Sequence, residues 1–278
     1  MWSGLGNLLV ERSKTSRCII IVAPYIKART LRRILRSAGS LSHLVCVTRW
    51  LVDELAQGVS DIRVREVTLA VGGKFMLHEN LHAKYYRFDG DVFIGSANMT
   101  DTALGWSRSP NLEVLYSPGE LFDFRQFEKK VMGNAREVGD LELQGWRLAV
   151  DSSQGLYGRI DERKRVIREW SPKARDVDSV LHVYSGRSDA IASEDELGAA
   201  MADVAALEIP LGLGETEVLA WVASRLVSSS FVSAVVARQG MGLDRAAKTL
   251  AEEYGRGVME ARRDLEAVHN WLSAIAAR

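Results

Sequence analysis

A histidine and a lysine stand two positions apart at His82 and Lys84, and a serine and an asparagine follow with the same spacing at Ser96 and Asn98. An imidazole can attack a phosphorus atom as a nucleophile. An ammonium, a hydroxyl and a carboxamide can donate hydrogen bonds to the non-bridging oxygens, whose charge must be stabilised during the displacement. These groups suit the cleavage of a phosphodiester, and the reaction needs no metal ligands.

The residues between the two pairs predict a β-hairpin. Residues 81–88 have the composition of a strand, and residues 91–94 are typical of a returning strand. Asp89 and Gly90 between them form a two-residue sequence that favours a tight hairpin turn. The two ends of the stretch should therefore lie side by side.

Counting back from this turn predicts the pairing of the two strands. Lys84 falls opposite Gly95, and His82 falls opposite Ala97. His82 and Lys84 are separated by one residue, so both should project from the same face of their strand. The serine and the asparagine, which flank Ala97, should lie beside them.

This order of residues resembles the HKD motif of the phospholipase D superfamily. The shared elements are His-x-Lys at 82–84, an aspartate at Asp89 and Gly-Ser-x-Asn at 95–98. The interval from Asp89 to the glycine is one residue shorter than in the commonest form of that family. Asn111-Leu112-Glu113 also resembles the short strand of single-motif members, where the glutamate helps to hold the catalytic histidine.

The resemblance covers roughly residues 15–140 and implies an α/β nuclease domain. It implies that His82 attacks phosphorus and forms a phosphohistidine, which water then hydrolyses. Lys84, with Ser96 and Asn98, would bind the phosphoryl oxygens, and Glu113 would orient an imidazole. The alternative for Glu113 is a solvent-facing position in an alternating strand. Asp89 belongs to the motif, but an aspartate before glycine is also what a turn alone requires, which favours a structural role.

Two other functions remain open. The first is a phospholipase or phosphatidyltransferase, although such relatives usually carry two motifs and often a membrane element. The second is a catalytically silent protein that binds phosphate through the same groups. The family resemblance also implies a prokaryotic restriction or antiviral setting with a possible defence-system partner protein, DNA as the substrate, and no metal or other cofactor.

A single His-x-Lys motif predicts a homodimer with a shared active site. One imidazole must attack phosphorus and another must protonate the leaving oxygen. A second His82 would come from an identical partner across a twofold axis, which brings the same residue to the axis from both sides. Phe93, Met99 and Trp106 are candidates for an apolar contact surface near the hairpin, and all three are equally compatible with a buried core.

Charge is distributed unevenly along the chain. Residues 1–117 carry 15 lysines and arginines against 10 acidic residues, a net charge of +5, and the chain as a whole is neutral with 36 of each. The remainder therefore carries −5. Arg29, Arg33 and Arg36 fall on one side of a predicted helix, where they either contact nucleic-acid phosphates or form a solvated face.

The composition is that of an ordinary globular protein, with 47% hydrophobic and 26% charged residues in 278. No apolar run is long enough to span a bilayer, and the first residues do not resemble a secretory signal, so a cytoplasmic location without membrane contact is expected. Cys18 and Cys46 lie in apolar runs that predict buried core positions.

Strands alternate with helices over the first half, which predicts an α/β/α sandwich around a mixed sheet. The predicted strands are 18–23, 43–48, 62–69, 81–88, 91–94 and 111–117, and the predicted helices are 28–37, 52–56 and 121–137. We assign residues 1–144 to this catalytic domain.

The second half predicts two further parts. Short strand candidates at 146–150, 156–160, 166–170 and 180–184 indicate a small β-rich element over 145–192. Helices predicted at 194–206, 215–236, 244–254 and 258–277 form a helical domain over 193–278. We interpret this part chiefly as a helical domain for dimerisation or partner binding. The alternative is a module related to helix-turn-helix, winged-helix and peptide-recognition domains, which residues 243–265 faintly resemble.

Overall fold

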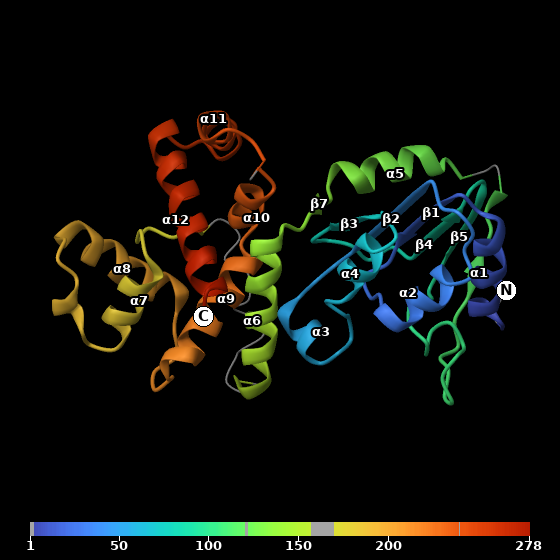
Figure 1. Cartoon of the computed structure of the whole chain (residues 1–278), viewed down its shortest axis with the longest axis horizontal. Coiled ribbons are helices and arrows are strands. Elements are labelled where there is room, and N and C mark those ends of the chain that lie inside the picture. Colours follow the sequence, from blue (N-terminus) through green and yellow to red (C-terminus); the bar gives the residue numbers. More distant parts are fainter. Residues whose placement is uncertain (1–2, 120–121, 157–169, 239) are drawn as a thin grey trace. The chain divides into compact units, whose positions relative to one another are not determined.

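The structure is a computed structural model that describes residues 3–119, 122–156, 170–238 and 240–278. The chain forms two compact units, Met1–Glu137 and Val138–Arg278. Figure 1 shows strands and helices in the first unit and helices in the second. The predicted boundary after residue 144 is wrong, because it falls inside a helix that begins at Asp140.

A seven-stranded mixed sheet in the order β6-β5-β4-β1-β2-β3-β7 forms the centre of the first unit. The strands are β1 (Cys18–Val22), β2 (His43–Thr48), β3 (Lys74–Leu77), β4 (Tyr85–Phe88), β5 (Asp91–Gly95), β6 (Leu115–Tyr116) and β7 (Arg136–Glu137). Strands β1, β2 and β3 are parallel, and the other pairings are antiparallel. The predicted α/β architecture around a mixed sheet is confirmed.

Helices cover both faces of this sheet (Figure 1). They are α1 (Leu5–Thr15), α2 (Ala28–Leu35), α3 (Val52–Ala56), α4 (Val64–Leu69) and α5 (Phe124–Gly133). Helix α5 packs through Val131 on a cluster that includes Ile20, Val45 and Tyr85. Because strand side chains alternate, Ile21 of β1 is buried on the other face. Burial on both faces explains why β1 is a continuous apolar run.

The predicted strand at 62–69 is wrong, because this segment forms helix α4. Its buried residues are Val64, Val67 and Thr68, a spacing that matches one face of a helix rather than alternation along a strand. The strand of this region, β3, begins later at Lys74 and was not predicted. Its four residues are too few to give a clear pattern by themselves.

The prediction of buried core positions is confirmed for Cys46 and not for Cys18. Cys46 is fully buried and Cys18 is partly buried. Burial raises the pKa of the Cys46 thiol to about 12, so this sulfur is held as a neutral thiol at physiological pH. Cys46 is therefore a core residue.

The described part of the second unit is helical. Its elements are α6 (Asp140–Leu156), α7 (Val177–Tyr184), the short 3-10 helix η3 (Ser188–Ala190), α8 (Glu194–Leu207), α9 (Glu215–Ser228), α10 (Ser230–Val236), α11 (Leu243–Tyr254) and α12 (Val258–Ala276). The helices predicted after residue 193 are confirmed, with a break at Ser229 between α9 and α10, where this serine caps α10 by accepting from the Val232 N–H.

The predicted β-rich element is wrong where the structure describes it. The candidates at 146–150 and 180–184 lie in helices α6 and α7. Leu143, Trp146 and Ala149 are buried at intervals of three residues, which is helical spacing. The candidate at 166–170 and most of that at 156–160 lie outside the described residues.

None of the described helices is by itself long and apolar enough to cross a bilayer. Helices α9 and α10 pass that test of length and composition only as a pair, and they are bent by 78°. Most of their side chains, including Trp221 and Phe231, are buried inside the second unit.

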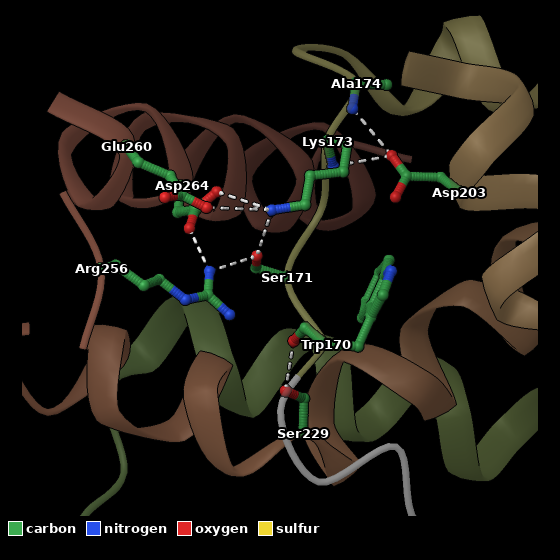
Figure 2. A network of polar contacts seen from close by, with 9 residues as sticks. All are labelled: Trp170, Ser171, Lys173, Ala174, Asp203, Ser229, Arg256, Glu260 and Asp264. Atoms are coloured by element: carbon green, nitrogen blue, oxygen red, sulfur yellow. Dashed lines mark hydrogen bonds and ion pairs between the residues drawn. The ribbon is translucent and has the colours of Figure 1, made fainter. Parts of the chain in front are cut away.

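Residues 170–174 are held in the second unit by buried polar groups (Figure 2). The Asp203 carboxylate, on α8, accepts hydrogen bonds from the backbone N–H groups of Lys173 at 2.8 Å and Ala174 at 2.7 Å. The Trp271 indole N–H on α12 donates to the Ala174 carbonyl at 3.0 Å. These hydrogen bonds give partners to backbone N–H and C=O groups that lie outside regular secondary structure.

A second group of contacts holds the same segment from α12 (Figure 2). Arg256 donates to the Ser171 hydroxyl at 2.9 Å and pairs with Asp264. The Lys173 ammonium lies 3.6 Å from the same Asp264 carboxylate. The guanidinium also stacks over the Phe231 ring, 4.1 Å from its centroid. The segment therefore contacts α8, α12 and Arg256, which lies just before α12.

Asp203 should make the second unit less stable at neutral pH than in mild acid. Burial raises its pKa to about 6 from 3.8, against the lowering effect of the hydrogen bonds it accepts. The folded unit therefore holds this proton more tightly than the unfolded chain does. The resulting stabilisation is fully present below pH 3.8 and is lost as pH rises through about 6, an effect of roughly 3 kcal/mol.

This prediction is checked by denaturant unfolding of the full chain between pH 4 and 7, followed by tryptophan fluorescence, for wild type and Asp203→Asn. The neutral side chain of the variant cannot titrate, so the difference in unfolding free energy between the two proteins should change with pH. Parallel pH profiles would contradict the assignment.

Candidate active site

The hairpin has the predicted register. Tyr85 pairs with Ile94, and the Gly95 N–H donates to the Lys84 carbonyl at 3.3 Å. Strand β4 begins only at Tyr85, so His82 and Lys84 lie in the segment leading into the strand rather than within it. The reason is that the neighbouring strand β1 ends at Val22 and leaves these residues without a ladder partner on that side.

Asp89 lies at the other end of the hairpin. It adopts a left-handed backbone conformation with φ of 50°. Its carboxylate accepts hydrogen bonds from the backbone N–H groups of Cys18 at 2.8 Å and Arg17 at 3.2 Å, and so ties the turn to the start of β1. About 15 Å of chain separate it from Lys84. The structure does not bring Asp89 to the other motif residues, and its contacts are structural.

Ser96 and Glu113 meet next to the end of β5. The Ser96 hydroxyl donates to the Glu113 carboxylate, and it accepts from the Val114 N–H at 3.1 Å. Asn111 donates its side-chain amide to the same carboxylate at 3.2 Å. Within the described residues no hydrogen bond joins Glu113 to His82, the contact that the resemblance implies.

Gly95 permits this meeting. An added Cβ at this position would lie 1.9 Å from the Val114 carbonyl oxygen, so only glycine allows the segment of β6 to approach β5 this closely. The Ser96 N–H donates to the same carbonyl at 3.0 Å. The glycine of the motif is therefore required by backbone packing that places Ser96 against Glu113.

We expect Gly95→Ala to destabilise the first unit by about 1–3 kcal/mol, the usual cost of overpacking, and to impair the site. The measurement is denaturant unfolding together with a phosphodiester cleavage assay. Gly90→Ala is the control in the same hairpin, because a Cβ there would meet no atom within 4 Å. Equal behaviour of the two variants would contradict this explanation of the motif glycine.

Lys84 is partly buried beside charged groups. Its ammonium donates to the His82 carbonyl at 2.9 Å. The pKa of Lys84 is lowered chiefly by burial and further by the positive charge of Arg49, whereas the Glu113 carboxylate acts to raise it. The negative charge of Glu113 therefore acts on Lys84, and the same carboxylate is hydrogen-bonded to Ser96.

His82 and Asn98 complete the group. His82 is exposed, and in the part of the chain that the structure describes its imidazole has no hydrogen-bond or ion-pair partner. The Asn98 side-chain oxygen accepts from the Tyr25 N–H at 3.4 Å, which leaves the amide N–H groups as its remaining donors. Both side chains are therefore available to a ligand.

Tyr86 supports the site from beneath and was not identified from the sequence. Its fully buried hydroxyl donates to the carbonyl of Ala97 at 2.7 Å, between Ser96 and Asn98. The pKa of Tyr86 is raised by burial and, less strongly, by Glu113, so the hydroxyl keeps its proton and remains a donor. Two adjacent tyrosines in a strand carry no signal that distinguishes this role from packing.

The predicted arginine stripe is exposed on α2 but partly engaged. Arg29 lies 3.5 Å from the Asp101 carboxylate, and the Arg33 guanidinium stacks 3.9 Å from the centre of the Trp106 ring. Arg36 is exposed at the end of the helix. The helix follows Lys27, whose N–H donates to the Met99 carbonyl at 2.9 Å, so its first turn begins near the end of the motif.

The three apolar residues considered for a contact surface do not form one. Phe93 and Met99 are buried in the core. The Trp106 ring packs against Gly6 so closely that a Cβ added at position 6 would clash with the ring. The exposed apolar residues of this region are instead Leu112, Val114 and Tyr116, with 85%, 48% and 60% of their surface accessible.

The first unit is thus an α/β domain with a candidate phosphodiester site at one end of a central hairpin. Comparison with family models and with curated proteins gives no match. Among solved structures, the chain is similar to NucT from Helicobacter pylori, with 16% identity over 48% of this chain and 89% of that chain and a TM-score of 0.37. It is also similar to Nuc from Salmonella typhimurium, described as a phospholipase D family member, with 18% identity, the same two coverages and a TM-score of 0.37.

Proposed function

We propose that this protein is a metal-independent phosphodiesterase that cleaves nucleic acid, with DNA as its substrate. The observation that carries the proposal is the hairpin register, in which the Gly95 N–H bonds to the Lys84 carbonyl. This register brings the segment with His82 and Lys84 beside Ser96, whose hydroxyl is bonded to Glu113. We propose that this nucleophile, cation and set of neutral donors bind one phosphate between them.

In the proposed reaction a ring nitrogen of His82 attacks phosphorus and forms a phosphorus–nitrogen bond. The bond from phosphorus to the leaving oxygen breaks, and a second imidazole gives that oxygen a proton. Water then attacks the phosphohistidine, loses a proton to the second imidazole and restores free His82. Lys84 and Asn98 donate to the non-bridging oxygens throughout, and Ser96 donates to them once its hydroxyl turns from Glu113 to the bound phosphate.

The second imidazole is proposed to be His82 of an identical partner. Leu112, Val114 and Tyr116 are exposed at every second position of the segment that includes β6, and β6 is an edge strand. An edge with exposed apolar side chains favours association. This edge lies next to Ser96 and Glu113, so we propose it as the dimer contact in place of Phe93, Met99 and Trp106. The arginines of α2 are proposed to contact DNA phosphates.

The proposed function is tested by incubating the protein in excess chelator with single-stranded DNA, double-stranded DNA, RNA and phosphatidylcholine vesicles. We expect cleavage of DNA without added metal. Cleavage of the lipid alone would favour the phospholipase alternative. Binding of DNA without cleavage of any substrate would favour a silent phosphate-binding protein, and activity that requires Mg²⁺ would contradict the mechanism.

The shared site predicts a distinctive response to mixed subunits. Wild-type and His82→Ala chains are unfolded together, refolded at varying ratio and assayed for DNA cleavage. If each site needs both histidines, a mixed dimer is inactive, and activity per total protein should fall as the square of the wild-type fraction. A linear decline, or full activity in a monomer identified by sedimentation, would contradict the shared site.

A further inference from the structure

Three side chains outside the motif form a cluster beyond the ends of strands β1 and β2. The Tyr25 hydroxyl donates to the Glu54 carboxylate at 2.9 Å, and Arg49 donates to the Tyr25 hydroxyl at 3.2 Å. Arg49 also forms an ion pair with the same Glu54 oxygen. The side chains of Arg49 and Glu54 are only 19% and 17% exposed, so the pair is largely shielded from water.

This cluster contacts both halves of the motif. On one side, Arg49 donates to the carbonyl of Leu81, the residue before His82, at 3.5 Å. On the other side, the Tyr25 N–H donates to the Asn98 side chain at 3.4 Å. The Tyr25 carbonyl accepts from the backbone N–H of Met99, the residue after Asn98, at 3.1 Å. The two halves of the motif thus meet the same cluster, Leu81 through the Arg49 side chain and Asn98 through the Tyr25 backbone.

The polar contacts of the cluster are not optimal for the stability of the fold. Arg49 Nε and Glu54 Oε2 are buried, and among the described residues neither has a hydrogen-bond partner. Each unsatisfied buried polar atom opposes folding, and a buried ion pair is often no more stabilising than apolar residues of the same size. A charged cluster with this cost, placed beside the motif, favours a functional role.

The cluster also acts on Lys84 through its charge. The groups that set the pKa of Lys84, besides burial, are Arg49, which lowers it, and Glu113, which raises it. Glu54 partly neutralises Arg49 through their ion pair. Removal of Arg49 and removal of the Glu54 charge should therefore shift the Lys84 ammonium in opposite directions.

We propose that Tyr25, Arg49 and Glu54 are positioning residues that hold the His82 segment and Asn98 in register. The catalytic consequence rests on the proposed phosphodiesterase function. The structural consequence does not, because the contacts to Leu81 and to Asn98 exist whatever reaction the site performs.

The decisive measurement is a nuclear magnetic resonance titration of the Lys84 side chain in the full chain, with Lys84→Arg used to assign the signal. Arg49→Met should raise the pKa of Lys84, since a nearby positive charge is removed. Glu54→Gln should lower it, since Arg49 is no longer neutralised. A loss of packing alone has no reason to produce shifts of opposite sign.

The fold offers a matched control. Tyr85, Arg87 and Glu128 form the same chemical triad, with the Tyr85 hydroxyl 2.5 Å and the Arg87 Nε 2.6 Å from one Glu128 oxygen. Arg87 and Glu128 are shielded to a similar degree, with 13% and 14% of their side chains exposed. Arg87 is not among the groups that shift Lys84. Arg87→Met and Glu128→Gln should leave the Lys84 titration in place.

Kinetics supply a second readout. In Tyr25→Phe we expect kcat for DNA cleavage to fall about 10-fold with KM changed less than about twofold, because misplacement of reacting groups lowers the rate more than binding. Arg49→Lys keeps a positive charge but cannot contact Leu81, Tyr25 and Glu54 at the same time. It should show the same fall in kcat, and it serves as a second variant if Arg49→Met does not fold.

The outcomes separate the two proposals. One outcome is that the wild type cleaves no phosphodiester while Arg49→Met and Glu54→Gln shift the pKa of Lys84 in opposite directions. That result would support the role of the cluster and overturn the proposed function. An active wild type whose Lys84 titration and kcat are unchanged by Arg49→Met and Glu54→Gln would overturn the cluster alone. Equal changes in the Arg87→Met and Glu128→Gln controls would also overturn it, since they would reveal a general loss of stability.

Discussion

His82→Ala is expected to lower DNA cleavage by more than about 10⁴-fold, because it removes the nucleophile and, in a symmetric dimer, the proton donor as well. The imidazole is exposed and makes no described polar contact, so the fold should be unaffected. The measurement is single-turnover cleavage of a labelled oligonucleotide in excess chelator, with a denaturing quench at alkaline pH, because the phosphorus–nitrogen bond is labile in acid. Wild type should form a labelled covalent adduct between His82 and the cleaved DNA, and the variant should not.

His43→Ala is the control for this variant. His43 is also an exposed histidine, at the start of β2 and far along the chain from the motif. It should retain full activity. Substantial cleavage by His82→Ala, or an equal loss in both variants, would contradict the role of His82 as nucleophile.

Lys84→Met is expected to lower kcat about 10²- to 10³-fold, the usual effect of losing one preorganised donor to a developing charge. Lys84 has a lowered pKa, so wild-type activity should decline on the alkaline side at a lower pH than an ordinary lysine would allow. The protonated form is the donor, so its loss with rising pH removes activity. The measurement is the pH profile of kcat/KM.

Two variants complete this experiment. Lys84→Arg keeps a positive charge that does not titrate in this range, so its residual activity should lack the alkaline decline. Lys74→Met removes a lysine whose ion pair with Glu137, at 2.6 Å, is half exposed, and should leave the profile unchanged. A wild-type alkaline decline that persists in Lys84→Arg would assign it to another group.

Local sequence determined the candidate hairpin. The Asp89-Gly90 turn and the alternation around it set the register, and the structure has Lys84 bonded to Gly95 as counting from the turn predicts. Such features are determined by neighbouring residues, because the turn type limits the pairing of the strands that it joins. Strand β2 and helix α3, whose residues form continuous local patterns, were predicted with their observed bounds.

Segments with weaker local patterns were decided by their surroundings. Residues 64–69 are apolar at positions compatible with either a strand or a helix, and packing beneath the sheet selects the helix. The same holds for α6 and α7, where β-branched and aromatic residues predicted strands but burial follows helical spacing. In these segments tertiary contacts outweigh intrinsic propensity.

The sequence by itself determined which groups carry the proposed chemistry and how the hairpin pairs them. Only the tertiary structure decided what surrounds them: Asp89 fastened to β1, the Val114 carbonyl against Gly95, and Tyr25 joined to Arg49 and Glu54. The physical reason is distance along the chain. A turn is set by adjacent residues, whereas these contacts join strands, loops and a helix that meet only after the sheet has formed, and no local pattern records them.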